Sequence, residues 1–125
     1  ISIHIPSSDP LTPQIIEKSI DEAREVFKNS YPELNIKAFT CYSWMLNPNF
    51  LDILGKETNL TYFADMFYKF PIKNSGQAIY SFVYKLPEPA SSPDDLAENS
   101  SLRRGIKKFL QSGNVFYEFG GILKL

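Results

Sequence analysis

The sequence predicts an α/β (α+β) domain in which helices flank a small mixed sheet, and three stretches predict it. Residues 1–5 alternate apolar and polar side chains, as a half-buried strand does. Residues 12–30 repeat apolar side chains at helical spacing. Residues 36–44 are rich in β-branched and aromatic residues, which favours a strand. A strand, a helix and a second strand in this order imply a parallel pair joined by a right-handed crossover.

The helix predicted over 12–30 has a recognisable start and end. Thr12 can cap its first turn, and Pro13 suits the first helical position because its missing N–H is not needed there. Tyr31 ends the helix, since the residue before a proline disfavours the helical region. The strand over 36–44 is nearly apolar throughout, so we expect a central strand covered on both faces.

Two segments in the middle of the chain fit either kind of element. Residues 58–70 place apolar side chains both in alternation and at helical spacing, and we favour a helix to about residue 68 with Thr58 as its cap. Residues 75–84 show the same ambiguity, and we favour a helix capped by Ser75.

The other elements are marked by their ends. Asn47-Pro48 and Gly55 predict a short helix over 48–54, and three prolines make 86–95 a surface loop. The last elements are a helix from Ser100 or Ser101 to Gly113 and a strand over 115–119, interrupted by Gly120-Gly121.

Composition narrows the classes of function. The 125 residues make one domain, 1–125, and the net charge of −1 gives no electrostatic basis for nucleic-acid binding. No apolar run reaches the about 20 residues of a membrane helix, so we expect a cytoplasmic protein without membrane partners. One His and one Cys leave no nitrogen–sulfur metal site. The basic cluster is interpreted as a solvated helix face: Arg103, Arg104, Lys107 and Lys108.

His4 and Cys41 are candidates for nucleophilic chemistry. Each lies near the C-terminal end of its predicted strand, which places both at the sheet edge where α/β proteins bind ligands. A His near a Cys can activate it as a thiolate, whereas the alternative is a buried small hydrophobe and a solvent-facing His. Trp44 lines a ligand pocket or closes the core, and the helix start at Thr12 binds an anion or is only capped.

Several motifs together resemble a known family. They are Ile-His-Ile-Pro at 3–6, the long helix ending in Phe27, the run from Ala38 to Pro48, Leu51 and Leu54, Thr58-Asn59-Leu60, Phe63, Phe67, Ser-Leu-Arg-Arg at 101–104 and the terminal Gly-Gly. With these the chain resembles, over nearly its whole length, the GNAT-like C-terminal domain of bacterial acyltransferase-domain proteins. The segment around Cys41, Ser43 and Trp44 is the most specific part of the resemblance.

The resemblance implies half of a GNAT (N-acetyltransferase) fold. In that superfamily two parallel strands splay apart around the thioester of acetyl-CoA, and backbone N–H groups between strand and helix bind the pyrophosphate. It thereby implies Tyr42, Ser43, Ser8 and Thr12 as cofactor contacts. It also places Tyr62 in the region of the general acid. The loop at 6–11 departs from the superfamily because it holds two prolines and Asp9 but no Gly or Arg, which does not support the usual pyrophosphate binding.

We therefore expect the C-terminal domain of an acyltransferase that uses acetyl-CoA or another acyl-CoA. The chain begins at Ile1 within a strand, so an N-terminal domain of the same polypeptide is the expected partner, with a small-molecule acyl acceptor. Acyl transfer would be direct, with a strand N–H near residues 41–43 polarising the carbonyl. The alternatives are a non-catalytic binding or scaffolding domain and Cys-dependent acyl transfer through Cys41 and His4.

Overall fold

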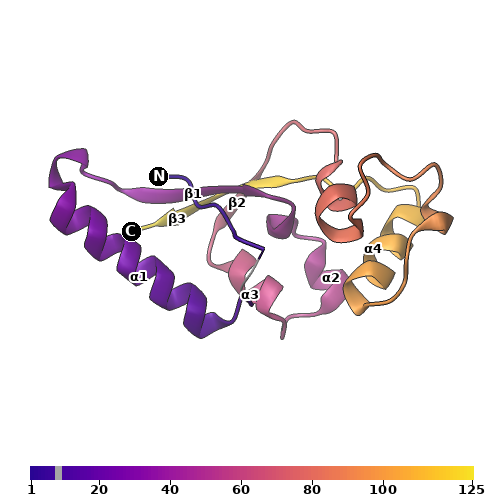
Figure 1. Ribbon diagram of the computed structural model, residues 1–125, viewed down its shortest axis with the longest axis horizontal. Helices are drawn as coiled ribbons and strands as arrows, with labels where there is room; N and C mark the ends of the chain where they lie inside the picture. The colour runs from indigo at the N-terminus through magenta and orange to yellow at the C-terminus, as the bar shows by residue number, and fades with distance from the viewer. Residues whose placement is uncertain (8–9) are drawn as a thin grey trace.

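The structure is a computed structural model that describes residues 1–7 and 10–125. Three strands form one antiparallel sheet in the order β1-β3-β2, and an isolated parallel bridge between Ser2 and Thr40 adds the first residues to the outer edge of β1. The predicted α/β (α+β) class with a small sheet and flanking helices is confirmed (Figure 1). The elements are α1 Pro13–Ser30, η1 Pro32–Leu34, β1 Ala38–Ser43, η2 Trp44–Leu46, α2 Phe50–Leu54, α3 Asn59–Asp65, β2 Tyr68–Pro71, η3 Tyr80–Tyr84, η4 Pro93–Asp95, α4 Ser101–Gln111 and β3 Phe119–Lys124.

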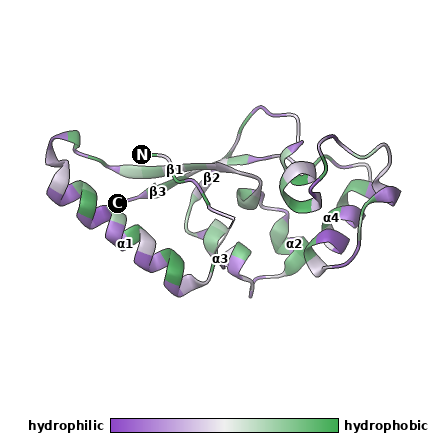
Figure 2. Ribbon diagram, viewed as in Figure 1, coloured by the Kyte–Doolittle hydropathy of each residue, from purple (hydrophilic) through white to green (hydrophobic). Residues whose placement is uncertain are grey.

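One core lies between the sheet and the two helices α1 and α3, which Figure 1 shows on the same side of the strands. Alternate residues of β1, Phe39 and Cys41, point into it and are almost fully buried. They meet Ile16 and Ile20 of α1, whose buried face carries the hydrophobic residues seen in Figure 2. The helix begins as predicted, because the Thr12 hydroxyl accepts a hydrogen bond from the Ile15 N–H at 3.4 Å.

A second core lies among α2, η3 and α4, and η2 joins it to the first. Trp44 packs into the second core, where its ring meets Phe50 edge-on at 5.8 Å. Leu46, two residues later, is fully buried in the first core. This single turn therefore fixes the two halves of the fold to each other and to the end of β1.

The first residues form less of a strand than predicted. The parallel relation to β1 is present, but it consists of one bridge. The strand over 36–44 is also not covered on both faces, because Tyr42 is 57% exposed. The central position belongs to β3 instead.

The C-terminal strand was placed too early in the sequence, and its glycines do not interrupt it. Two side-chain amides form hydrogen bonds with the main chain just before Phe119. Asn74 donates to the Glu118 carbonyl and accepts from the Glu118 N–H, both at 3.1 Å. Asn47 donates to the Tyr117 carbonyl at 2.9 Å. These bonds replace a neighbouring strand, so the ladder starts at Phe119. It then runs through Gly120 and Gly121, as the close packing of these residues requires.

The two ambiguous segments each change structure partway along. In 58–70 the helix, capped by Thr58, ends at Asp65, and β2 begins at Tyr68. In 75–84 the helical turns belong to the second half, and Ser75 does not cap them. The Asn74 carboxamide accepts from the Gly76 N–H at 3.0 Å and turns the chain there instead.

Two predictions about polar residues were also only partly right. The short helix begins at Phe50, because Asn47 is buried and accepts from the Asn49 N–H at 2.8 Å. Lys107 does not belong to a solvated face. Its ammonium group is buried against the carbonyls of Asp94 and Leu96, at 2.9 and 3.0 Å, and holds the 86–95 loop on α4.

Substitution of Gly121 by Ala should destabilise the domain. An added Cβ would lie 2.7 Å from Leu46 Cδ1 and 2.9 Å from Phe67 Cβ, and such overpacking costs about 1–3 kcal/mol. Urea denaturation should show a lower midpoint at unchanged slope. Ile122→Val, on the more exposed face of the same strand, keeps a β-branched side chain, is the control and should stay within about 0.5 kcal/mol of the wild type. A Gly121→Ala midpoint equal to that of this control would contradict the packing described.

Candidate functional site

The outer edge of β1 is where the candidate site begins. In an antiparallel pair alternate residues bond to the partner strand, so those between them point their main-chain groups to the other edge. Thr40 points outward: its N–H donates to the Ile1 carbonyl at 2.8 Å, and its carbonyl accepts from the Ile3 N–H at 2.6 Å. Tyr42, two residues on, must point the same way.

The first segment leaves β1 immediately after that bridge. Continuing the parallel ladder would bond Tyr42 to Ile3 and Ile5. Within residues 1–7 and 10–125 neither bond forms. The N–H and carbonyl of Tyr42 and the N–H of Ile5 therefore have no main-chain partner within the described part of the chain. Figure 1 shows the N-terminal trace turning away from β1 there.

A cleft of about 350 Å³ occupies this divergence. Residues 3–7 form one wall and residues 41–45 the other, while Phe82, Lys85 and Glu118 close the remaining side. The structure thus brings together five residues selected from the sequence: His4, Cys41, Tyr42, Ser43 and Trp44.

Cys41 does not have the environment of a nucleophile. Its residue is 1% exposed, and burial raises the pKa of the thiol to about 11. The thiol is protonated at neutral pH, whereas catalysis requires the thiolate. Nothing in this geometry favours the pairing of Cys41 with His4 that Cys-dependent acyl transfer needs.

Ser43 and Trp44 shape the cleft through their structural roles. The Ser43 hydroxyl accepts from the Met45 N–H at 3.1 Å, which starts the η2 turn directly after β1. Trp44 is 8% exposed, and its ring is held in the second core. The same residue lines the cleft, and a contact between Trp44 and a ligand stays a prediction.

The three residues that close the remaining side of the cleft were not found from the sequence. A helical pattern places Phe82 inward, but η3 is a π-helix, and Phe82 is 61% exposed. Lys85, at its end, has a left-handed backbone with φ of 59°, which is unusual for a residue other than Gly. Glu118 comes from the stretch held by Asn74. The change of helical pitch has no marker in the sequence.

The remaining candidates lie outside the cleft. Tyr62 is on α3, and its hydroxyl donates to the Glu17 carboxylate of α1; this bond is the main reason why the pKa of Tyr62 is raised. Thr12 caps α1, and Ser8 lies outside the described residues. A smaller apolar cavity of about 160 Å³ lies between residues 3–6, the start of α1 and Phe63.

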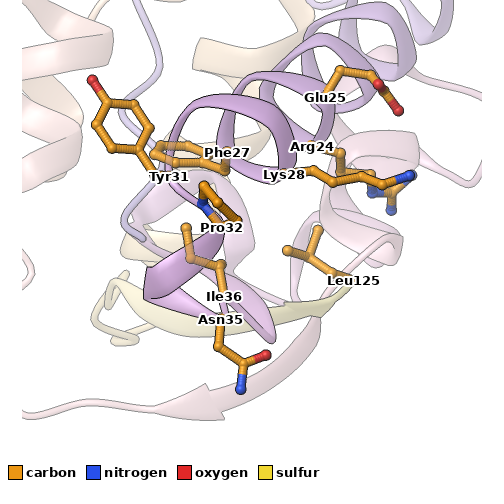
Figure 3. A pocket seen from close by; sticks show the side chains of 9 residues that line it. All are labelled: Arg24, Glu25, Phe27, Lys28, Tyr31, Pro32, Asn35, Ile36 and Leu125. Atoms are coloured by element: carbon orange, nitrogen blue, oxygen red, sulfur yellow. The ribbon is translucent and has the colours of Figure 1, made fainter.

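A larger cavity of about 470 Å³ lies at the opposite end of α1. Figure 3 shows Arg24, Lys28 and Tyr31 around it, with Leu125 closing the side formed by β3. The 18 residues of α1 span about 27 Å, so this cavity is remote from the cleft despite its size. None of the sequence-selected residues lines it.

No helix of the described chain is long and apolar enough to cross a membrane. The same residues contain no cluster of three or more His, Cys, Asp or Glu side chains suited to a metal ion.

The burial of Cys41 should make stability depend on alkaline pH. The unfolded thiol ionises near pH 9 but the folded one near pH 11, so the native state holds the proton longer. Relative to Cys41→Ala, the free energy of unfolding should be constant below about pH 8 and fall by about 1.4 kcal/mol per pH unit between those values. Chemical denaturation of both proteins from pH 7 to 11 measures this difference. A difference that stays constant across that range would show that the folded thiol ionises like an exposed one.

Several proteins of known structure share this fold. No curated protein matches the sequence. Three crystal structures of acyltransferases are similar to this chain: one in complex with decanoyl-CoA and teicoplanin (25% identity, TM-score 0.84), one with CoA and 10C-teicoplanin (24%, 0.85) and one with decanoyl-CoA (25%, 0.84). Each similarity covers 99% of this chain but only 39–40% of the other, so the chain spans about two-fifths of the length of those proteins.

A family model extends over almost the same residues. It describes the GNAT-like C-terminal domain and matches residues 1–123, which confirms the resemblance read from the motifs at 3–6 and 38–48. The match covers both the diverging segments around the cleft and the packed helices behind them. The chain therefore belongs to the family of GNAT-like C-terminal domains.

Proposed function

We propose that this chain is the acyl-CoA-binding part of an acyl-CoA-dependent acyltransferase. The observation that carries the proposal is the set of open main-chain groups of Tyr42 and Ile5 on the 350 Å³ cleft. The similar acyltransferases were crystallised with acyl-CoA or CoA, which supports this choice of ligand. Unpaired strand groups are costly unless water or a ligand pairs with them, and the pantetheine arm of CoA carries amides that can do so.

An acyl-CoA bound here would supply an activated acyl group as its thioester. The Tyr42 N–H is the strand donor expected near residues 41–43, and it can polarise the thioester carbonyl. The walls at residues 3–7 and 41–45 would hold the donor in a fixed orientation for attack by an amine or hydroxyl of the acceptor. We propose an acyl-CoA as the acyl donor and a small molecule as the acceptor.

The start of α1 is a weak anchor for the pyrophosphate. The Thr12 hydroxyl already pairs with the Ile15 N–H, and Pro13 has no N–H to offer. We infer that affinity depends mainly on the cleft and on cations supplied elsewhere in the longer polypeptide. The small number of free N–H donors at the start of α1 supports the alternative of a non-catalytic binding domain. The open cleft supports the transferase.

His4 is the proposed proton acceptor for the attacking group. It is exposed, lies on the cleft wall and is the single histidine of the chain. Histidine is the side chain that most often acts as a general base in proteins. Tyr62 is proposed as a proton donor only if its hydroxyl leaves Glu17.

Binding is tested by titrating the protein with decanoyl-CoA and with CoA. Ligand at 100 times its dissociation constant should stabilise the fold by about 2.7 kcal/mol, measured by thermal shift, with heats measured by calorimetry. Ser7→Phe should abolish binding because it fills the cleft, while the surface variant Ser91→Phe should not. Absence of binding to both this chain and the full-length polypeptide would remove the acyl-CoA function and favour the non-catalytic alternative.

Catalysis is tested with His4→Gln in the full-length polypeptide. Loss of a general base typically lowers kcat by about 10²–10⁴-fold. Binding of acyl-CoA should change little, because the main-chain groups of residues 3–5 remain. Cys41→Ala should retain turnover, since the thiol is buried and protonated. Full activity of His4→Gln would assign the proton transfer to another residue, and loss of activity in Cys41→Ala alone would restore the Cys-dependent alternative.

A further inference from the structure

The sheet is packed on one face and open on the other. The open sheet face consists of five outward residues of the three paired strands: Thr40, Tyr42, Tyr68, Phe70 and Ile122. Ala38, Gly120 and Lys124 lie on the same side of the sheet. Tyr68 is 76%, Tyr42 57% and Ile122 40% exposed. Figure 1 shows α1 and α3 on the other side of the strands, and within the described residues none of these five side chains belongs to either core.

The pattern on this face is that of an interface rather than of a solvated sheet. An antiparallel sheet that faces water normally alternates apolar inward residues with polar outward ones. Here five of the eight outward positions are aromatic or β-branched, and Lys124, at the end of β3, is the one that carries a charge. The register places Thr40, Ile122 and Tyr68 in one row. Contiguous apolar patches of this kind, rich in Tyr, mark sites of protein contact.

Two aromatic side chains of the open sheet face are already packed in the absence of a partner. The Tyr42 and Phe70 rings meet edge-on at 6.5 Å, and the Phe70 ring lies over Gly120, where a Cβ would collide with it. The Tyr42 and Phe70 rings are thus held in place on the sheet, so little of their side-chain freedom is lost when a partner binds.

We propose that the N-terminal part of the same polypeptide docks on this open sheet face. The proposal rests on the proposed function, in which this chain is one portion of a longer acyltransferase. The similar acyltransferases are about two and a half times as long as this chain, so most of each lies outside the matched region. The main chain of Ile1 is bonded to Thr40 at the edge of this face, so any preceding residues start beside it.

Continuity with the cleft supports the same occupant. Tyr42 belongs both to the open sheet face and to the cleft wall, and its neighbours on the wall include the exposed residues His4 and Phe82. A domain seated on the face would therefore border the cleft and exclude water from it. The middle of the open sheet face carries no charged side chain. This favours a permanent apolar contact over an electrostatically steered encounter with a separate protein.

Hydroxyl-radical footprinting of the full-length polypeptide tests the docking. Tyr31 and Tyr117, which are 48% and 45% exposed and lie off the open sheet face, are internal references. If the face is free, Tyr68 should be oxidised faster than either reference. The docked arrangement predicts that Tyr68 and Phe70 are oxidised several-fold more slowly than the references, at every protein concentration. Oxidation of Tyr68 at the fastest rate overturns the proposal, and protection that disappears on dilution assigns the face to a second copy of the chain and overturns it as well.

A matched pair of variants gives a second measurement. Tyr68→Asp places a charge on the β2 side of the open sheet face, while Tyr31→Asp places one at an exposed site outside it. In the full-length polypeptide Tyr68→Asp should restore fast oxidation of Phe70 and lower the unfolding temperature, and Tyr31→Asp should do neither. Equal behaviour of the two variants contradicts docking. Acyl-CoA binding is measured separately, so protection of the face without binding refutes the proposed function alone, and binding without protection refutes only the docking.

Discussion

The alternation of hydrogen bonds along β1 is the constraint on which the site depends. Because Phe39, Cys41 and Ser43 lie on the positions that bond to β3, the main-chain groups of Thr40 and Tyr42 face the outer edge. Thr40 holds the first residues of the chain, and Tyr42 is left open where they diverge. A register shift of one residue would exchange these roles and would also turn the buried side chains of β1 outward. The cleft and the first core are therefore specified by the same pairing.

The two glycines of β3 secure that register. Gly121 allows Leu46 and Phe67 to approach the sheet from the core side, and Gly120 allows Phe70 to lie flat on the open side. Since Leu46 belongs to η2, its position also fixes Trp44 at the end of β1 and hence one wall of the cleft. One wall of the cleft is thus built on the end of β1 and on core residues, which suits a function that depends on orientation.

Sequence patterns predicted those parts of the molecule that local chemistry determines. Thr12, Thr58 and Ser100 cap the helices that they were expected to cap, and the strand around Cys41 follows from its β-branched and aromatic residues. The cleft residues from His4 to Trp44 were reached through strand ends and a family resemblance. The misplacements arose from tertiary contacts: Asn47 and Asn74 bond to a stretch some 44 to 70 residues away and delay β3, and packing decides where α3 gives way to β2. No local signal reports such distant partners, and none reports the π-turn that exposes Phe82.

The position of β3 in the sheet has a consequence for how the domain is made. It is the last of the strands in sequence but the middle one in space, so β2 has no neighbouring strand and β1 has only the short bridge to Ser2 until β3 is made. During synthesis α1 and β1 leave the ribosome some eighty residues before their partner, and only the helices can form contacts meanwhile. Closing so long a loop is slow, as in other folds whose pairings are distant in sequence. Until then the edge of β1 that pairs with β3 is unprotected, and this interval is when the domain is most exposed to misassembly and most dependent on chaperones.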